Sequence, residues 1–200
     1  MESDEKLRWN RKYGEASRAS FSLEPESFLV SAYSEFVSGL PPGDALDLAG
    51  GAGRHALWLA QHGWKVKLID IAEAGIALAD ERARSMLPAA RGSVTSEVLD
   101  LESVQTLGVD RYELILVFFY LQRNLFPALM RALKPGGFLI YQTYVADQQS
   151  LPGGPRDPAY LLNPNELREA FRVLQILHYR ERSTNRATAE LVARKETVKS

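Results

Sequence analysis

Two aspartates and a run of glycines occur where a buried strand should give way to a helix. The stretch DALDLAGGAGRHALWLAQ holds Asp47 just ahead of Gly50, Gly51 and Gly53, and a second acid, Asp70, closes the next apolar run. Glycines lack a Cβ, so the chain can turn sharply here and a ligand can approach the backbone closely. The turn also aims the first N–H groups of a helix at whatever lies there. The spacing therefore predicts a ligand site in this loop.

The two acids indicate which ligand suits the loop. The sequence G-A-G-R-H-A from Gly51 fits the G-x-G-x-x-G/A pattern of dinucleotide binding, and Asp70 stands where an acid would bind a ribose. Asp47 would repel a pyrophosphate, however, and would attract a cation. S-adenosylmethionine has a ribose, no phosphate, an α-ammonium and a sulfonium, so it suits the two acids better. A tight turn that binds nothing is the third interpretation.

Apolar runs of strand length alternate with helical patterns along most of the chain. The predicted strands are 45–48, 65–71, 94–101, 112–119 and 138–144, and the predicted helices are 54–61, 73–86 and 125–133. Parallel strands joined by crossover helices form a sheet buried on both faces, with ligands outside the carboxyl ends of the strands. Two last runs, 172–182 and 188–195, indicate an antiparallel hairpin. We therefore expect an α/β fold: a Rossmann-like doubly wound sheet of about seven strands, mostly parallel with a C-terminal antiparallel hairpin.

Composition limits the partners of the chain. Lys plus Arg number 24 and Asp plus Glu 25, so no global charge favours nucleic acid or an anionic membrane. Cysteine is absent, which excludes disulfides, thiolate metal sites and a cysteine nucleophile. No apolar stretch approaches the roughly 18 residues that cross a bilayer. We expect one cytoplasmic domain that consists of a helical cap at 1–40 and a core at 41–200. It should act on a small molecule and use no metal, and its oligomeric state stays open.

Four segments resemble the successive motifs of class I S-adenosylmethionine-dependent methyltransferases. They are DLAGGAGR at 47–54, LID at 68–70, EVLDLE at 97–102 and LKPGGFLI at 133–140. The resemblance spans nearly the whole chain, and within the superfamily it is greatest to the small bacterial methyltransferases of the tellurite-resistance and thiopurine methyltransferase type. The family's loop is commonly D-x-G-x-G-x-G, and here Ala49 replaces the first glycine. One added methyl is small, so we expect the loop to keep its function.

The resemblance implies contacts with S-adenosylmethionine. Ala49, Gly51 and Gly53 would lie behind its methionine portion, while Asp47 and Arg54 would hold the ammonium and the carboxylate.

Around the adenosine, the resemblance implies that Asp70 takes the ribose hydroxyls, which one carboxylate can accept as a pair. Ile71 would pack on the adenine, and Asp100 with Leu101 would meet its edge. Asp100 could instead cap the segment that follows it. Phe118, at the end of the fourth strand, is a further candidate contact with the cofactor.

The fourth strand ends in LVFFYLQR and limits the methyl acceptor. It lacks the Asn/Asp-Pro-Pro-Tyr/Phe signature of adenine and glutamine N-methyltransferases and the acids that would hold magnesium for a catechol. An aromatic, nearly uncharged lining suits a soft or already ionised nucleophile, such as a thiolate or an oxidised chalcogen species. The candidates for the substrate pocket are Tyr120, Arg123, Trp9 and Tyr13. Methyl transfer mostly needs positioning and exclusion of water, so no catalytic residue is assigned.

Two other functions stay open on the sequence. An NAD(P)-dependent oxidoreductase would use the same glycines, and a non-catalytic module could bind S-adenosylmethionine or its product. The segments 1–13 and 145–160 lie outside the alternating core. We expect both to be mobile and to cover the bound ligand, the second as a loop without secondary structure.

Overall fold

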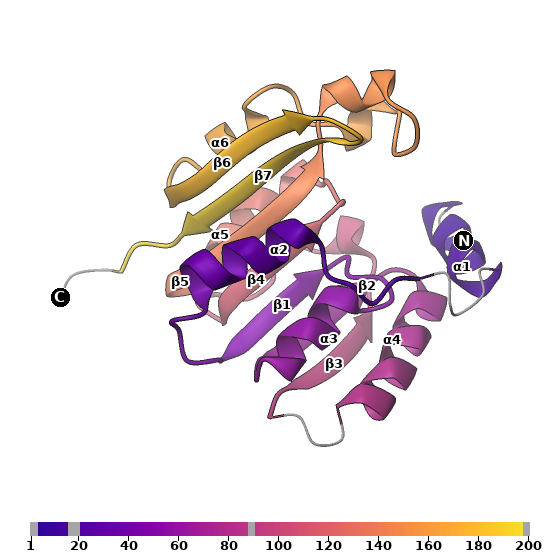
Figure 1. Ribbon diagram of the computed structural model, residues 1–200, viewed down its shortest axis with the longest axis vertical. Helices are drawn as coiled ribbons and strands as arrows, with labels where there is room; N and C mark the ends of the chain where they lie inside the picture. Colours follow the sequence, from indigo (N-terminus) through magenta and orange to yellow (C-terminus); the bar gives the residue numbers. More distant parts are fainter. Residues whose placement is uncertain (1–3, 16–20, 88–90, 198–200) are drawn as a thin grey trace. The chain divides into compact units, whose positions relative to one another are not determined.

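The computed structural model describes residues 4–15, 21–87 and 91–197, which divide into two compact units, Met1–Ser103 and Val104–Ser200. Seven strands follow the order β3-β2-β1-β4-β5-β7-β6 (Figure 1). Pairing is parallel between β1 and β2, β2 and β3, and β4 and β5, and antiparallel where β7 joins β5 and β6. The predicted α/β fold, Rossmann-like and mostly parallel with an antiparallel C-terminal hairpin, is confirmed. The division into a cap at 1–40 and a core at 41–200 stays a prediction.

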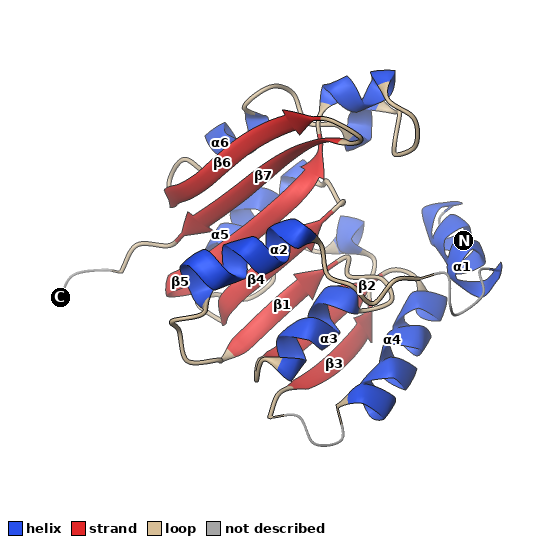
Figure 2. Cartoon of the chain, viewed as in Figure 1, coloured by secondary structure: helices blue, strands red, loops and turns tan. Residues whose placement is uncertain are grey.

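The first unit alternates strands with helices, as the apolar periodicity predicts (Figure 2). Its strands are β1 (Asp44–Leu48), β2 (Lys65–Asp70) and β3 (Ser93–Val98); its helices are α1 (Asp4–Glu15), α2 (Ser27–Ala32), the π-helical turn η2 (Tyr33–Val37), α3 (Arg54–Gln61), α4 (Glu73–Met86) and the 3-10 turn η3 (Leu101–Ser103). Leu46 and Leu68 are fully buried, and α3 and α4 pack on the strands. The prediction that the third strand reaches residue 101 is wrong, because after Val98 the chain turns into η3.

The second unit carries the antiparallel hairpin. Its strands are β4 (Tyr112–Phe118), β5 (Leu133–Tyr144), β6 (Gln175–Ser183) and β7 (Ala187–Arg194); its helices are α5 (Phe126–Ala132), α6 (Glu166–Ala170) and the 3-10 turns η4 (Arg123–Leu125), η5 (Ala146–Ser150) and η6 (Pro158–Tyr160). Phe126 and Phe171 pack on the buried ring of Tyr141, with centroid distances of 6.1 and 6.0 Å. Two predicted boundaries shift by more than one residue: β5 begins at Leu133 rather than 138, and β6 at Gln175 rather than 172. None of the helices in the described ranges is both long and apolar enough to span a membrane.

The turn that follows β1 is built from left-handed residues. Ala49, Gly51 and Gly53 have φ values of 55°, 56° and 78°. Glycine adopts this region at no steric cost, whereas an alanine loses roughly 1–2 kcal/mol there because its Cβ crowds the following carbonyl. Ala49 therefore keeps the shape of the loop but destabilises it.

We predict that Ala49→Gly raises the free energy of unfolding by up to about 1 kcal/mol, because it removes the strain of a left-handed alanine. The greater entropy of glycine in the unfolded chain opposes this gain and is the smaller effect. Urea unfolding of the variant and of the parent chain measures the difference. Ala52→Gly is the matched control, because Ala52 lies in the same loop without a positive φ and should lose stability. A stability loss for Ala49→Gly equal to that of Ala52→Gly would contradict the prediction.

The segment 145–160 is anchored at several points. It contains η5 and η6, so the prediction of a loop without secondary structure is wrong. Gln148 is fully buried; its Nε2 donates to the carbonyl of Gly153 at 2.8 Å, and its Oε1 accepts from the N–H of Ala187 at 2.9 Å. One buried amide thus connects the segment to the start of β7, because both of its polar atoms are paired with backbone.

We predict that Gln148→Ala lowers the free energy of unfolding by about 1 to 3 kcal/mol, since it leaves the buried N–H of Ala187 without its partner. The matched control is Gln149→Ala, which removes an exposed amide that donates to the carbonyl of Arg156. That change should cost less than about 1 kcal/mol. Equal losses in urea unfolding would show that the buried amide does not hold the segment.

Candidate functional site

Asp47 lies at the carboxyl end of β1 and has no exposed surface. Its Oδ2 accepts a hydrogen bond of 3.1 Å from the N–H of Ala56, in the first turn of α3. Gly53, at the N-cap of α3, has no side chain to accept this bond, so Asp47 takes that role from the neighbouring strand. Its Oδ1 is also buried and has no hydrogen-bond partner within the described residues.

Burial raises the pKa of Asp47 to about 7, although the Ala56 N–H opposes the shift. A buried acceptor without a partner costs free energy, and a donor that reaches it recovers that cost. A cationic donor recovers the most, because it also favours the ionised form of the carboxyl. The loop thus offers one oxygen that suits an ammonium group.

Asp70 is the last residue of β2, and its carboxylate connects this strand to the glycine loop and to the residue before α4. Its Oδ2 accepts from the N–H of Gly51 and its Oδ1 from the N–H of Ala72, both at 2.8 Å. Burial raises its pKa, while these backbone hydrogen bonds lower it. The N–H of Ile71 acts on the carboxylate in the same way. A carboxylate has about four acceptor positions, so Asp70 can hold the loop and still accept a hydroxyl donor such as that of a ribose.

Helix α1 places Tyr13 directly over the glycine loop. A Cβ at Gly51 would lie 2.0 Å from the Tyr13 hydroxyl, and one at Gly75 would lie 3.0 Å from its ring. The rings of Trp9 and Phe21 lie 6.1 and 4.8 Å from that of Tyr13. Burial raises the pKa of Tyr13, and the charge of Asp70 acts in the same direction. Tyr13, predicted for the substrate pocket, therefore lies at the loop predicted for the cofactor. Trp9, a second candidate for that pocket, stacks on Tyr13.

Contacts between α1 and α4 hold Tyr13 in place. The Oδ1 of Asn10 accepts from the N–H of Ala74 at 3.0 Å, and Lys6 pairs with Glu73 at 2.6 Å. Asn10 thus caps α4, whose own N-cap residue makes no side-chain bond. Asn10 and Gly75 were missed from the sequence, although a glycine inside a helical pattern signals that a neighbour approaches closely.

Arg54 and His55 begin α3 beside the loop. Arg54 pairs with Glu26 at 2.9 Å, and the Nε2 of His55 accepts from the N–H of Glu26 at 3.3 Å. Burial, with the charge of Arg54, lowers the pKa of His55 to about 3, so the ring is neutral at physiological pH. Contact between Arg54 and a cofactor carboxylate stays a prediction.

The residues predicted around the adenine lie at the carboxyl ends of β2 and β3. Ile71 follows Asp70 and is half-buried, and Leu101 is buried at the start of η3. The Oδ1 of Asp100 accepts from the N–H of Glu102 at 2.9 Å. Asp100 therefore caps η3, which was the alternative interpretation, and contact of these residues with an adenine stays a prediction.

The remaining candidates belong to the second unit, at the end of β4. Phe118 is buried, and Tyr120 is half-buried with its hydroxyl donating to the side chain of Gln122. Arg123 pairs with Glu166 and donates to the carbonyls of Ala159 and Leu161 at 3.2 and 2.9 Å. These bonds give Arg123 a structural role in holding η6, and its binding of a substrate stays a prediction.

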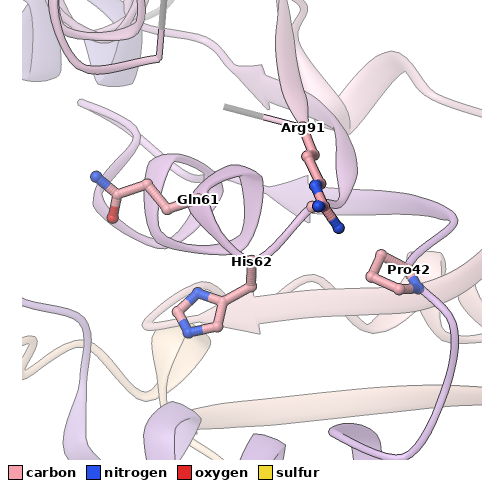
Figure 3. Close-up of a pocket in the computed structure, with 5 residues that line it drawn as sticks. Pro42, Gln61, His62 and Arg91 are labelled. Atoms are coloured by element: carbon pink, nitrogen blue, oxygen red, sulfur yellow. The ribbon is translucent and has the colours of Figure 1, made fainter. Parts of the chain in front are cut away.

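A surface hollow of about 440 Å³ lies elsewhere in the first unit. Pro42, Gln61, His62, Gly63 and Arg91 line it, and Arg91 reaches toward the space between His62 and Pro42 (Figure 3). These residues precede β1, β2 and β3, so the hollow lies at the amino ends of the strands. It is distinct from the loop at their carboxyl ends. Within the described ranges no group of three or more His, Asp or Glu side chains could hold a metal ion.

Comparisons with known proteins give one match to a family model and a shared fold. Residues 45–137 match the model of a family described as a methyltransferase domain. No curated protein is similar enough in sequence to count as a match. Many solved structures share the fold, and eight of them are 13% to 20% identical to this chain in sequence.

Three of these structures are proteins with different names and the same degree of similarity to this chain. Magnesium protoporphyrin IX methyltransferase (ChlM) from Synechocystis PCC 6803, with bound SAH, is 18% identical with a TM-score of 0.67 over 96% of this chain and 95% of that one. TehB from Haemophilus influenzae is 18% identical with a TM-score of 0.67 over 94% and 67%. The [4+2]-cyclase SpnF is 18% identical with a TM-score of 0.67 over 84% and 80%. Residues 45–137 therefore match a methyltransferase domain, and the chain has the fold of the S-adenosylmethionine-dependent methyltransferases.

Proposed function

We propose that the chain is an S-adenosylmethionine-dependent methyltransferase that acts on a small molecule. The observation that carries the proposal is the pair of buried carboxylates at the glycine loop. Asp47 has a buried Oδ1 without a partner among the described residues, and Asp70 retains lone pairs for hydroxyl donors. Two acids at one loop favour a cationic ligand over the pyrophosphate of NAD(P). The methyltransferase-domain match and the bound SAH in the Synechocystis enzyme support the same ligand.

The residues of the loop fit the parts of this cofactor. When bound, S-adenosylmethionine would supply a methyl carbon that a nucleophile attacks in line with the C–S bond, so that S-adenosylhomocysteine leaves as the neutral thioether. Asp47 would hold its α-ammonium and Asp70 its ribose hydroxyls, while Gly51 lets the ligand approach the backbone. Binding and orientation are thus what the protein contributes, and positioning is a large part of catalysis for such a displacement.

The acceptor that we propose is a soft or already ionised nucleophile, such as a thiolate or an oxidised chalcogen species. Aromatic residues at the end of β4 support it because their side chains are uncharged; they are Phe118, Phe119 and Tyr120. We place the chain near the tellurite-resistance and thiopurine methyltransferase type on its motifs, and the likeness to TehB is consistent with that placement. The near-zero net charge favours a small partner over nucleic acid or membrane.

Calorimetric titration with S-adenosylhomocysteine, S-adenosylmethionine and NAD tests the cofactor. We expect both sulfur compounds to bind and NAD not to bind. Asp70→Asn should weaken S-adenosylhomocysteine binding by about 10-fold to 100-fold, the scale of a charge-assisted hydrogen bond. The matched control, Asp80→Asn, removes a carboxylate of α4 that is absent from the loop and should leave the affinity unchanged.

Two outcomes would contradict the proposal. Binding of NAD in place of the sulfur compounds would favour the oxidoreductase, and equal affinities of the two variants would show that the ribose is held elsewhere. Asp70→Asn also disturbs two backbone hydrogen bonds, so its unfolding curve is measured beside its affinity. A variant that remains folded at the temperature of titration separates loss of binding from loss of structure.

The raised pKa of Asp47 predicts how stability changes with pH. The folded chain keeps this proton up to about pH 7, whereas the unfolded chain loses it near pH 4. The free energy of unfolding should therefore fall as pH rises between those values, by at most about 1.4 kcal/mol per pH unit. Asp70, whose pKa is also raised, adds to the fall. In Asp47→Asn the part due to Asp47 should vanish, which urea unfolding at several pH values would measure.

A cationic ligand should reverse this effect. An ammonium beside Asp47 favours the carboxylate, so S-adenosylhomocysteine binding near pH 6 should release a proton. Titration in buffers of different ionisation enthalpy measures that proton, and Asp47→Asn should abolish its release. Release that persists in the variant would assign the proton to another group.

A further inference from the structure

The residue after β4 has a backbone conformation that side chains rarely adopt. Phe119 has a φ of 56°, while its N–H donates to the carbonyl of Gln142 at 2.8 Å. A bulky residue in this region costs free energy, and such residues cluster where ligands bind. The two rings of Phe118 and Phe119 lie 6.4 Å apart. The strained turn thus brings both rings to one place at the carboxyl end of β4.

A guanidinium lies on this aromatic cluster. The rings of Phe119 and Tyr144 have centroids 5.2 Å apart, and the guanidinium carbon of Arg186 lies 5.1 Å from the Phe119 centroid. Arg186 belongs to the turn between β6 and β7 and is exposed. A guanidinium on an aromatic face can stack against a second planar group and can pair with a carboxylate through two parallel bonds.

A buried amide oxygen without a partner among the described residues lies in the same part of the second unit. Gln142 is 7% exposed, and its Oε1 finds no hydrogen-bond partner within the described residues. It lies opposite Phe118 in the register of β4 and β5, and two residues before Tyr144 on the same face of β5. An acceptor that is buried and unpaired suits an N–H or O–H donor of a ligand.

From these observations we propose that Arg186, Phe119 and Gln142 form an acceptor-binding site for a planar anion. Arg186 binds the anionic group, the ring of Phe119 stacks against the plane, and Gln142 accepts from a donor on it. The site deepens the proposed function, on which it rests, by giving the acceptor a shape and a charge. Arg186 determines specificity in this arrangement and takes no part in bond making.

Benzoate and benzamide are the probes, because they share size and plane and differ in charge. Calorimetric titration uses the full chain saturated with S-adenosylhomocysteine. We expect benzoate to bind at millimolar concentrations at least 10-fold more tightly than benzamide. Arg186→Gln should lose that preference and leave the affinity for S-adenosylhomocysteine unchanged. Arg172→Gln, an exposed arginine paired with Glu169, is the matched control and should behave as the parent chain.

Gln142 is tested by the three hydroxybenzoate isomers. At least one isomer should bind more tightly than benzoate, and Gln142→Leu should remove that gain while benzoate still binds. Gln142→Leu should also unfold at a higher urea concentration than the parent, since it removes a buried amide oxygen without a partner in the described part of the chain. Absence of any such isomer overturns the role of Gln142.

Three results would overturn the role of Arg186. They are no binding of benzoate, equal binding of benzoate and benzamide, and an unchanged preference in Arg186→Gln. In each case intact binding of S-adenosylhomocysteine would leave the proposed function standing and show that Arg186 only stacks on the turn. If the parent chain does not bind S-adenosylhomocysteine, the proposed function is instead rejected.

Discussion

The burial of two carboxylates, Asp47 and Asp70, is the constraint on which the rest of the first unit depends. A buried charge is tolerated only where donors reach it, and the backbone supplies those donors. Asp47 takes the N–H of Ala56 and so fixes α3 to β1; Asp70 takes the N–H groups of Gly51 and Ala72 and so fixes the loop to the next strand. Asp47 thereby caps α3, whose own N-cap residue is a glycine, and Asp70 fixes Ala72, the N-cap residue of α4, whose next turn is capped by Asn10.

The same constraint explains the shape of the loop. A turn that aims the N–H of Gly51 at Asp70 has left-handed residues at 49, 51 and 53. An alanine at the first of them shows that the geometry is imposed by these bonds and not by glycine alone. Tyr13 then packs where Gly51 leaves room. A ligand that enters this place must share it with the Tyr13 hydroxyl or move it, so α1 belongs to the site as much as the loop does.

The sequence predicted the features that depend on local pattern and missed those that depend on distant contacts. Alternating apolar runs predicted the strands. The glycines between two acids predicted the loop, at which Asp47 and Asp70 accept hydrogen bonds from backbone N–H groups. The end of β3 was wrong because Leu99 bonds to the carbonyl of Asp70, after which Asp100 caps η3. The bond from Asn10 to α4 joins residues 64 positions apart, and no spacing within either segment reveals it. Gln148 was missed for the same reason.

Fold alone does not decide the chemistry of this chain. A [4+2]-cyclase and a methyltransferase with bound SAH have the same TM-score to it, at the same 18% identity, so the scaffold accepts more than one reaction. What limits the choice is the charge at the loop. Asp47 is buried, one of its oxygens has no partner among the described residues, and its pKa is raised to about 7. Ionisation of this carboxyl without a nearby cation therefore lowers the free energy of unfolding. A cation that binds there recovers this loss, and a phosphate cannot. The energetic cost of Asp47 in the ligand-free chain is therefore an argument for a cationic cofactor that is independent of any likeness to other proteins.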